Sequence, residues 1–539
     1  MHGVLATASR SHPDAEALVF DDPLDAGCAR RWTYAELEDN ARRVAAALLA
    51  AGVGKAARVG LLLGNRPEAV ATIFGASMAG AVVVPLSTFS TRQELAYLLS
   101  HADISVLVTQ ERLLGRRFAD DVAALAPLPR PCPDLPHLRR VVVVGRQPAA
   151  DRHSAGAESW DELLASGEGV AAAVVDAAAA SVAPADGALI IYSSGTTEKP
   201  KGILHTQGAT ALQFWQQAEL FGRQGDTRMW TALPVFWTAG FNTAMGSTLA
   251  AGGCWVMQET FDPGEALALM ERERVTEPYT LPHQTAALEE HPAWVSTDFS
   301  SLRCVFGKSA FARHPSVDGD PGWSMPVGYG LSETGAFFSA HGYGASREER
   351  RASMGPLLPG NQLKVVDPST GEALDAGQEG ELAVRGPTLM DRYVKRDRRE
   401  CFDEDGFFHT GDTGFYDEEG FLHFSGRRTE MIKTGGANVS PAELEVALRA
   451  CPPVKLARAV GVPDALRGEE VVLCVVLKEG AAATEAEIRG FLAERVAAYK
   501  VPRRVLFLDD AEMPMTASGT KVRDDALREV LARRLGHRW

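Results

Sequence analysis

The chain has 539 residues, a length at which a single hydrophobic core stops growing, so we expect at least two domains. Hydrophobic residues make up 45% of it and charged residues 23%, which is ordinary for a globular enzyme. The net charge of −15 argues against broad nucleic-acid binding, and the lack of any run of about 18 apolar residues argues against a membrane span.

The seven cysteines are scattered along the chain, and none forms a C-x-x-C pair. This pattern favours buried free thiols in a reducing compartment over disulfides or a zinc site. The first residues, MHGVLAT, lack the basic stretch followed by an apolar one that marks a signal peptide. These observations together predict a cytoplasmic enzyme.

The first 90 residues alternate between helical and strand patterns. Thr33 and Glu36 predict a capping box, followed by apolar residues on one helix face and a stop at Gly52. Apolar strands are predicted at 59–63 and 82–85, with a helix from Glu68 to Ala79 between them. Continuous apolar strands in β-α-β order indicate a parallel sheet covered on both faces, and hence the α/β class.

The composition and the predicted secondary structure change twice further along the chain. Residues 146–186 are rich in small and polar residues and predict loops and a surface helix, before a buried strand at 188–191. Short strands separated by Gly- and Asp-rich turns predict a small antiparallel β subdomain at about 355–425.

A compact α+β unit of roughly 110 residues is predicted at the C-terminal end. It begins with a helix whose predicted capping box is Ser440 with Glu443. We therefore expect an N-terminal domain over residues 1–428 and a smaller one over 429–539.

Residues 192–202 read YSSGTTEKPKG and follow the strand at 188–191 directly. Small residues let the backbone wrap closely around phosphates, while hydroxyls and lysines supply donors and charge. The spacing differs from the G-x-x-x-x-G-K-[ST] pattern, which disfavours ordinary P-loop kinases and GTPases. A Ser/Thr/Gly surface loop without function is the alternative for this segment alone.

This segment resembles the signature of the adenylate-forming superfamily, which includes acyl-CoA synthetases, peptide-synthetase adenylation domains and luciferases. The resemblance covers nearly the whole chain and continues in order through five further segments. These segments are PVFWTAG at 234–240, GYGLSET at 328–334, TGD at 410–412, RRTEMIKTGGANVSPAELE at 427–445 and PMTASGTK at 514–521. The family implies a large layered α/β domain followed by a small mobile α+β domain.

The resemblance also implies roles for individual residues. Lys521 would be the catalytic lysine of adenylation, and Glu333 with Thr197 would hold Mg²⁺. Tyr329 would stack on adenine, Thr334 would touch phosphate and Asp412 would bind the ribose. The implied ATP/AMP-binding set is Ser193, Ser194, Gly195, Thr196, Thr197, Lys201, Tyr329, Gly330, Thr334, Asp412, Arg427 and Lys521.

In the CoA ligases of the family, the small domain turns about a hinge after the first half-reaction. The hinge position matches Thr429, where relatives commonly carry Asp or Lys. The turn would bring a Gly-Gly loop toward the pantetheine tunnel, which makes Lys433, Gly435 and Gly436 the candidates on the CoA side.

The acyl pocket carries the least typical residues. Trp237 stands where relatives often have His, and Gly307, Lys308 and Ser309 stand where they usually have Gly-Gly-Ala; all four are candidate pocket residues. No Asp that would pair with an amino-acid ammonium occurs from 234 to 246, which favours a plain carboxylic acid. The aromatic pair at 337–338 predicts an apolar wall suited to a fatty, aromatic or alicyclic acid.

The resemblance implies ATP, Mg²⁺ and CoA as cofactors or co-substrates and a small carboxylic acid as substrate. It also leaves alternatives open: loading of a carrier protein, a luciferase-type oxygenase, and a non-catalytic nucleotide-binding protein. A homodimer is one assembly that the sequence leaves open.

Overall fold

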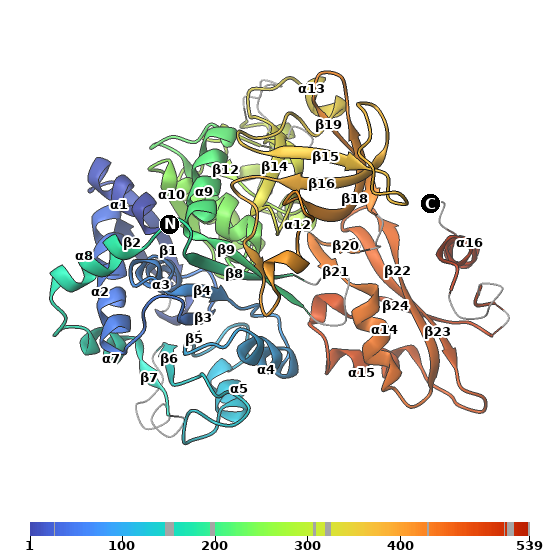
Figure 1. Cartoon of the computed structure of the whole chain (residues 1–539), viewed down its shortest axis with the longest axis horizontal. Helices are drawn as coiled ribbons and strands as arrows, with labels where there is room; N and C mark the ends of the chain where they lie inside the picture. The colour runs from blue at the N-terminus through green and yellow to red at the C-terminus, as the bar shows by residue number, and fades with distance from the viewer. Residues whose placement is uncertain are drawn as a thin grey trace.

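The computed structural model describes residues 1–25, 27–145, 156–193, 200–305, 309–317, 325–427, 431–510, 512–514 and 522–536. Layered sheets and helices of the N-terminal part lie on one side of the molecule, and the last segments, from β20 onward, lie on the other (Figure 1). The predicted α/β class is confirmed by this arrangement and by the strand pairings below.

The largest sheet of the described residues places its strands in the order β17-β9-β8-β4-β3-β5-β6-β7. Pairs from β8 to β7 are parallel, whereas β9 and β17 add antiparallel pairs at one edge. The strands are β3 (Arg58–Leu62), β4 (Val82–Pro85), β5 (Val106–Gln110), β6 (Arg140–Val144), β7 (Glu158–Ser159), β8 (Gly187–Ser193), β9 (Lys201–Thr206) and β17 (Arg392–Tyr393).

A second sheet has the order β12-β10-β11-β1-β2, and only its β1–β2 pair is antiparallel. Its strands are β1 (Glu16–Asp22), β2 (Cys28–Thr33), β10 (Arg228–Thr231), β11 (Cys254–Met257) and β12 (Glu277–Pro278). Helix α3 (Pro67–Met78) is buried along its whole length, and it shares one core with α2 (Tyr34–Ala50) and with residues of both sheets. This full burial explains why α3 has an apolar sequence on every side.

The predicted antiparallel strands form a separate sheet, β15-β16-β18-β19, in which each pair is antiparallel. They are β15 (Gln362–Val366), β16 (Gly380–Arg385), β18 (Phe408–Tyr416) and β19 (Leu422–Arg427). The hairpin of β13 (Val327–Leu331) and β14 (Ala336–His341) carries the segment at 328–334. Two of the recognised motifs therefore lie on antiparallel strands.

The C-terminal sheet has the order β21-β20-β23-β22, with β24 parallel to β23. Its elements are β20 (Ile432–Thr434), β21 (Ala437–Val439), α14 (Pro441–Arg449), β22 (Val454–Asp464), β23 (Gly468–Leu477), α15 (Glu485–Ala493), β24 (Arg504–Phe507) and α16 (Asp524–Leu535). The α+β composition agrees with the prediction. Helix α15 ends at Ala493, and residues 498–500 form a short 3₁₀ turn.

The helix caps agree with the sequence patterns only in part. Thr33 and Glu36 form the expected capping box of α2. Ser440, however, makes no side-chain cap bond to α14, so the capping box predicted there is wrong. The Glu443 carboxylate binds the ammonium of Lys500 through Oε1, while its Oε2 and the Ser440 hydroxyl have no hydrogen-bond partner among the described residues.

The remaining helices of the described residues complete the layers. They are α1 (His2–Ser11), α4 (Arg92–His101), α5 (Phe118–Leu125), α7 (Trp160–Ser166), α8 (Ala172–Ser181), α9 (Gln207–Phe221), α10 (Ser247–Ala250), α11 (Pro263–Arg272), α12 (Pro282–Glu290) and α13 (Glu349–Ala352). Within the described ranges, we find no helix with both the length and the apolar character that a membrane crossing needs. The cysteines are unpaired, and Cys28 is exposed rather than buried as expected, because it begins the edge strand β2.

Candidate active site

Three neighbouring cavities lie where the N-terminal sheets, the antiparallel sheet and the C-terminal part meet. The polar cavity, of about 840 Å³, is lined by residues such as Ser193, Glu333 and Thr410. The apolar cavity, of about 700 Å³, contains Leu233 and Trp237 in its wall. The interface cavity, of about 560 Å³, runs between Phe89 on the N-terminal side and Tyr499 on the C-terminal side.

The polar cavity collects pieces of separate sequence motifs. Ser193 and Lys201 come from the two ends of the 192–202 segment, and Glu333 comes from the turn after β13. Thr410 and Gly411 come from β18, and Lys433 comes from β20. Motifs more than 200 positions apart in the chain thus line one cavity.

The hairpin motif depends on glycine for its shape. A Cβ atom on Gly330 would lie 1.7 Å from the carbonyl oxygen of Ala336 across the hairpin, a distance that no side chain tolerates. Thr334 is fully buried, and its hydroxyl bonds to the backbone of Leu331 and Ala336 within the turn. In this structure Thr334 therefore holds the turn, and its contact with phosphate stays a prediction.

Glu333 lies at the centre of a small charged group. Its Oε1 accepts a hydrogen bond of 2.8 Å from the hydroxyl of Tyr393, and the ammonium of Lys201 lies 5.2 Å from the Tyr393 ring centre. Burial lowers the pKa of Lys201, and Arg396 lowers it further, while Glu333 acts in the opposite direction. A cationic donor and a carboxylate thus stand together in the wall of the polar cavity.

Asp412 lies on β18 directly opposite Arg427 of β19. Its carboxylate is almost fully buried, and its Oδ2 accepts a 2.9 Å hydrogen bond from the hydroxyl of Tyr329. The Tyr329 ring in turn stacks on Phe424 with 5.7 Å between ring centres. These contacts fix the two predicted nucleotide residues relative to each other, and their contacts with ribose and adenine stay predictions.

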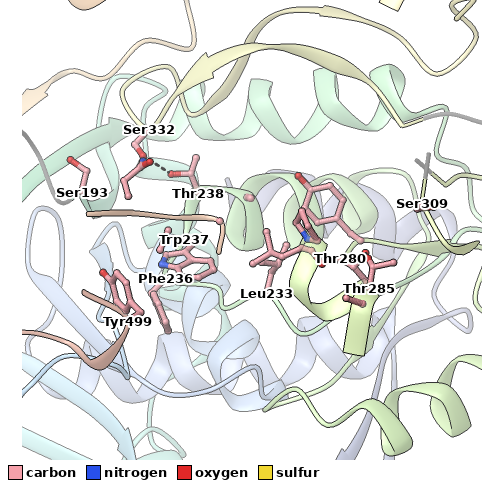
Figure 2. A pocket seen from close by; sticks show the side chains of 18 of the residues that line it. Ser193, Leu233, Phe236, Trp237, Thr238, Thr280, Thr285, Ser309, Ser332 and Tyr499 are labelled. Carbon is pink, nitrogen blue, oxygen red and sulfur yellow. Dashed lines mark hydrogen bonds between the residues drawn. The ribbon is translucent and has the colours of Figure 1, made fainter. Parts of the chain in front are cut away.

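The apolar cavity has aromatic and aliphatic walls with hydroxyl groups toward its ends. Figure 2 shows Trp237 and Phe236 beside Leu233, with Thr280, Thr285 and Ser309 farther along. The Phe236 and Trp237 rings meet edge to face, 5.8 Å apart. They immediately precede the π-helix Ala239–Gly246, a rare element that recurs at functional sites.

The polar and apolar cavities join around a short set of shared residues. Both cavities are lined by Ser193, Thr238, Ala239, Tyr279, Ser332 and Asn438. The Thr238 hydroxyl donates a 3.2 Å hydrogen bond to Ser332, as Figure 2 shows, which ties the π-helix segment to the hairpin motif. A group bound in one cavity would meet a group bound in the other at this junction.

The interface cavity opens from the other side of the aromatic wall. Trp237, Ala437 and Tyr499 line both it and the apolar cavity, so the aromatic wall separates the two spaces. Its lining includes three arginines, Arg467, Arg489 and Arg503, together with His283 and one carboxylate, Glu259. Burial lowers the pKa of His283, and the nearby Arg467 lowers it further.

Some of the predicted site residues line the three cavities, whereas Tyr329, Thr334 and Asp412 are buried beside them and line none. Lys433 lines the polar cavity, Gly435 the interface cavity and Gly436 the apolar cavity, while Trp237 and Ser309 line the apolar cavity as well. Several predicted residues lie outside the described ranges or have side chains outside them. These are Ser194, Gly195, Thr196, Thr197, Gly307, Lys308, Arg427, Thr429 and Lys521.

One sequence expectation for the pocket wall is wrong. Phe337 lines the polar cavity, and Phe338 is buried in the core of the antiparallel sheet, so the pair does not wall the apolar cavity. Successive residues of a strand point to opposite faces, which separates the two rings. Sequence reasoning also missed Thr238, although it directly follows the recognised Trp237.

A polar cavity framed by glycine, hydroxyl and lysine residues, joined to an apolar one, defines an enzyme that brings a nucleotide next to an apolar organic substrate. The interface cavity adds room for a further substrate, which would meet the apolar cavity at Trp237, Ala437 and Tyr499. The site is therefore organised for group transfer between three bound molecules.

Known proteins agree with this organisation. Residues 5–394 match the family described as AMP-binding enzyme, and residues 443–520 match its C-terminal domain. The indoleacetate–CoA ligase of Aromatoleum aromaticum is 34% identical, with 94% of each chain covered. The feruloyl-CoA synthase of an Amycolatopsis species is 33% identical, with 92% of this chain and 93% of that protein covered.

A solved structure shows the same fold. The o-succinylbenzoate CoA synthetase of Bacillus subtilis, a double mutant bound to a product analogue, superimposes with a TM-score of 0.76 at 25% identity, covering 98% of each chain. The chain therefore belongs to the AMP-binding enzyme family, in its acyl-CoA synthetase branch. It forms an acyl-adenylate from a carboxylic acid and ATP, and then transfers the acyl group to CoA.

Proposed function

We propose that the chain is a CoA ligase for an aromatic or alicyclic carboxylic acid, with ATP in the polar cavity, the acid in the apolar cavity and CoA in the interface cavity. The observation that carries this proposal is that the apolar cavity adjoins both others, sharing Thr238 with the polar cavity and Trp237 and Ala437 with the interface cavity. A carboxylate at the end of the apolar cavity would reach the α-phosphorus of a nucleotide in the polar one.

The reaction proceeds in two displacements. A carboxylate oxygen attacks the α-phosphorus of ATP, and the bond to pyrophosphate breaks. The CoA sulfur then attacks the carbonyl carbon, and AMP leaves with the oxygen that came from the acid. Because the first two reactants are both anionic, the enzyme mainly positions them and offsets their repulsion. We assign Lys201 and Lys521 to offset the repulsion between the carboxylate and ATP.

Glu333 fits the role of a Mg²⁺ ligand. Its carboxylate lines the polar cavity and uses Oε1 to accept from Tyr393, which leaves Oε2 for another partner. Mg²⁺ in nucleotide sites is typically held by one or two carboxylates together with substrate phosphates. When bound, the ion would neutralise charge on the departing pyrophosphate, and Thr197 is the second residue that we assign to it.

The acid class follows from the walls of the apolar cavity. Phe236, Trp237 and Tyr279 present ring surfaces, and these suit a ring-bearing substrate. Thr280 and Thr285 place hydroxyl groups farther along, 2.7 Å from each other, where a polar ring substituent could bond. The two named relatives act on indoleacetate and, by name, form feruloyl-CoA, which supports the same class.

A panel of acids tests this assignment. Arylacetic, cinnamic, alicyclic, straight-chain fatty and α-amino acids are compared by AMP formation with and without CoA. We expect ring-bearing acids to give the highest kcat/KM, at least about tenfold above medium-chain fatty acids, because a rigid ring stacks against Phe236 and Trp237 and loses less conformational freedom than a flexible chain. A clear preference for a straight-chain or an α-amino acid would contradict the assignment, and consumption of free CoA separates a ligase from a carrier-protein loader.

Asp412→Asn is expected to raise the KM for ATP by roughly tenfold or more, the scale of losing one charged hydrogen-bond acceptor. The carboxylate is the proposed ribose acceptor, so the KM for the acid should change little. Asp417→Asn, in the turn directly after β18, is the matched control, because Asp417 also accepts a side-chain hydrogen bond, from His423, but lies outside the TGD motif. Equal changes in the two variants would assign the effect to the fold of this sheet.

CoA is assigned to the interface cavity because its phosphates need cationic partners. Arg467, Arg489 and Arg503 line this cavity, and Ala437 and Tyr499, which it shares with the apolar cavity, suit a pantetheine arm. Gly435 and Gly436 both have positive φ values, +56° and +80°, so the loop bends tightly where the thiol would pass. We assign these two glycines to the thiol-transfer half-reaction, with residue 429 as the hinge between residues 1–428 and 429–539.

A further inference from the structure

In place of a capping box, Glu443 of α14 belongs to a buried charge cluster. Lys500 is only 4% exposed, and its ammonium lies 2.8 Å from Oε1 of Glu443 on α14 and 2.8 Å from Oε1 of Glu94 on α4. Glu94 belongs to the N-terminal part, whereas Lys500 and Glu443 belong to the C-terminal part. One buried cation thus joins carboxylates from both sides of the interface.

The partners of Lys500 are held in place by their own elements. Glu94 is the third residue of α4, and its Oε2 accepts a 2.7 Å bond from the backbone of Thr91 in a complete capping box. Its Oε1 also accepts from the backbone of Ala497, at 3.3 Å, next to the 3₁₀ turn that carries Lys500. The Glu94 carboxylate therefore grips both the side chain and the backbone of the C-terminal turn.

Burial alone would lower the pKa of Lys500, yet Tyr499, Glu443 and Glu94 together raise it above its usual value, so the side chain is charged. A buried charge is tolerated only when it is paired and hydrogen-bonded. Two carboxylates share this ammonium, and removing either leaves a weaker interaction with the other. The position of the C-terminal part therefore depends on this buried charge cluster at the interface.

The same turn reaches the active site. Tyr499 lines both the apolar and the interface cavity, and its ring meets Phe89 edge to face, 6.0 Å between centres. In this arrangement Gly436, Ala437 and Asn438 also line the apolar cavity, as thiol transfer would require. The Lys500 contacts thus exist in the orientation that places Gly435 in the wall of the interface cavity and Gly436 in the wall of the apolar cavity.

We propose that Lys500 is a positioning residue for thioester formation, which holds the C-terminal part in its thiol-accepting orientation by bridging Glu443 to Glu94. The proposal rests on the proposed two-orientation function. Adenylation needs the other orientation, in which Lys521 approaches the polar cavity, so the bridge favours the second half-reaction only.

Glu94→Gln is the sharpest test, because glutamine still serves a capping box while losing the charge that Lys500 binds. Thioester formation is followed in a single turnover from supplied acyl-AMP and CoA, and adenylation is followed by acid-dependent pyrophosphate exchange. We expect the rate of thioester formation to fall by roughly tenfold or more, because a buried charge pair is weakened. The rate of adenylation should stay within about twofold of the wild-type rate. Glu36→Gln, the same change in the capping box of α2, should alter neither rate.

Lys500→Gln removes the ammonium of the bridge itself. It should likewise slow thioester formation while leaving the rate of adenylation nearly unchanged. The double variant Glu94→Gln/Lys500→Gln should lose no more than the stronger single variant, because both changes break the same Lys500–Glu94 contact. Equal losses in both half-reactions, or no loss in thioester formation, would overturn the proposal. Failure of the wild-type chain to form acyl-AMP or thioester would instead overturn the proposed function, so the two outcomes are distinguishable.

Discussion

Replacing Lys521 by alanine is expected to slow acid-dependent pyrophosphate release by at least about 10²–10³-fold, the scale of losing one preorganised charged donor. Lys521 ends the PMTASGTK motif, and the resemblance assigns it to the contact between the substrate carboxylate and the α-phosphate. Thioester formation from supplied acyl-AMP should survive, because that step no longer needs the α-phosphate to be activated. The measurement is pyrophosphate release beside single-turnover thioester formation.

Lys478→Ala provides the matched control for this variant. Lys478 also belongs to the C-terminal part, and its ammonium bonds to the backbone oxygen of Pro452 away from the three cavities. Its loss should leave both half-reactions close to wild type. If Lys521→Ala reduced the two half-reactions equally, the separation of the reaction into two orientations would be wrong.

Gly436→Val is expected to slow thioester formation by about 10–100-fold, because it strains the backbone of the loop. Its effect is thus opposite to that of Lys521→Ala, which slows adenylation. The residue has φ of +80°, and a Cβ atom there would lie 2.4 Å from a Leu281 methyl carbon at the edge of the apolar cavity. A β-branched side chain at positive φ is strained, so the loop must shift away from the junction. Pyrophosphate exchange should be retained, because adenylation uses the other orientation.

Gly480 offers a control with nearly the same backbone. Its φ is +74°, and a Cβ atom there would have no neighbour within 4 Å, so Gly480→Val carries the strain without the contact. We expect it to lower stability while leaving the ratio of the two half-reaction rates unchanged. A similar shift of that ratio in both variants would remove the role assigned to the Gly-Gly loop.

Much of the N-terminal fold follows from local sequence patterns. The strand β4 has the predicted bounds, and the capping box at Thr33 and Glu36 forms as expected, because both signals depend on neighbouring residues. The predicted capping box at Ser440 is absent, and Glu443 instead binds Lys500, 57 positions further along the chain. Such a contact between distant segments is one that local patterns cannot reveal.

The sequence predicts individual residues of the site, but it does not predict how they lie relative to one another. Motif order identifies Glu333, Asp412 and Trp237, but only the structure brings Thr238 and Ser332 into a hydrogen bond at the junction. Phe338 illustrates the limit, since its apolar character fits either a pocket wall or the core, and the strand places it in the core. The Lys500 bridge has no signal in the sequence, because lysine near a C-terminal turn is usually a solvated charge.

The central claim is that the acid is activated as an acyl-adenylate before CoA attacks, and the path of the carboxylate oxygen tests it most directly. An acid labelled with ¹⁸O in its carboxyl group is turned over with ATP and CoA, and the products are analysed by mass spectrometry. The account predicts one labelled oxygen in AMP and none in free phosphate. Label in inorganic phosphate together with ADP, or unlabelled AMP, would contradict it.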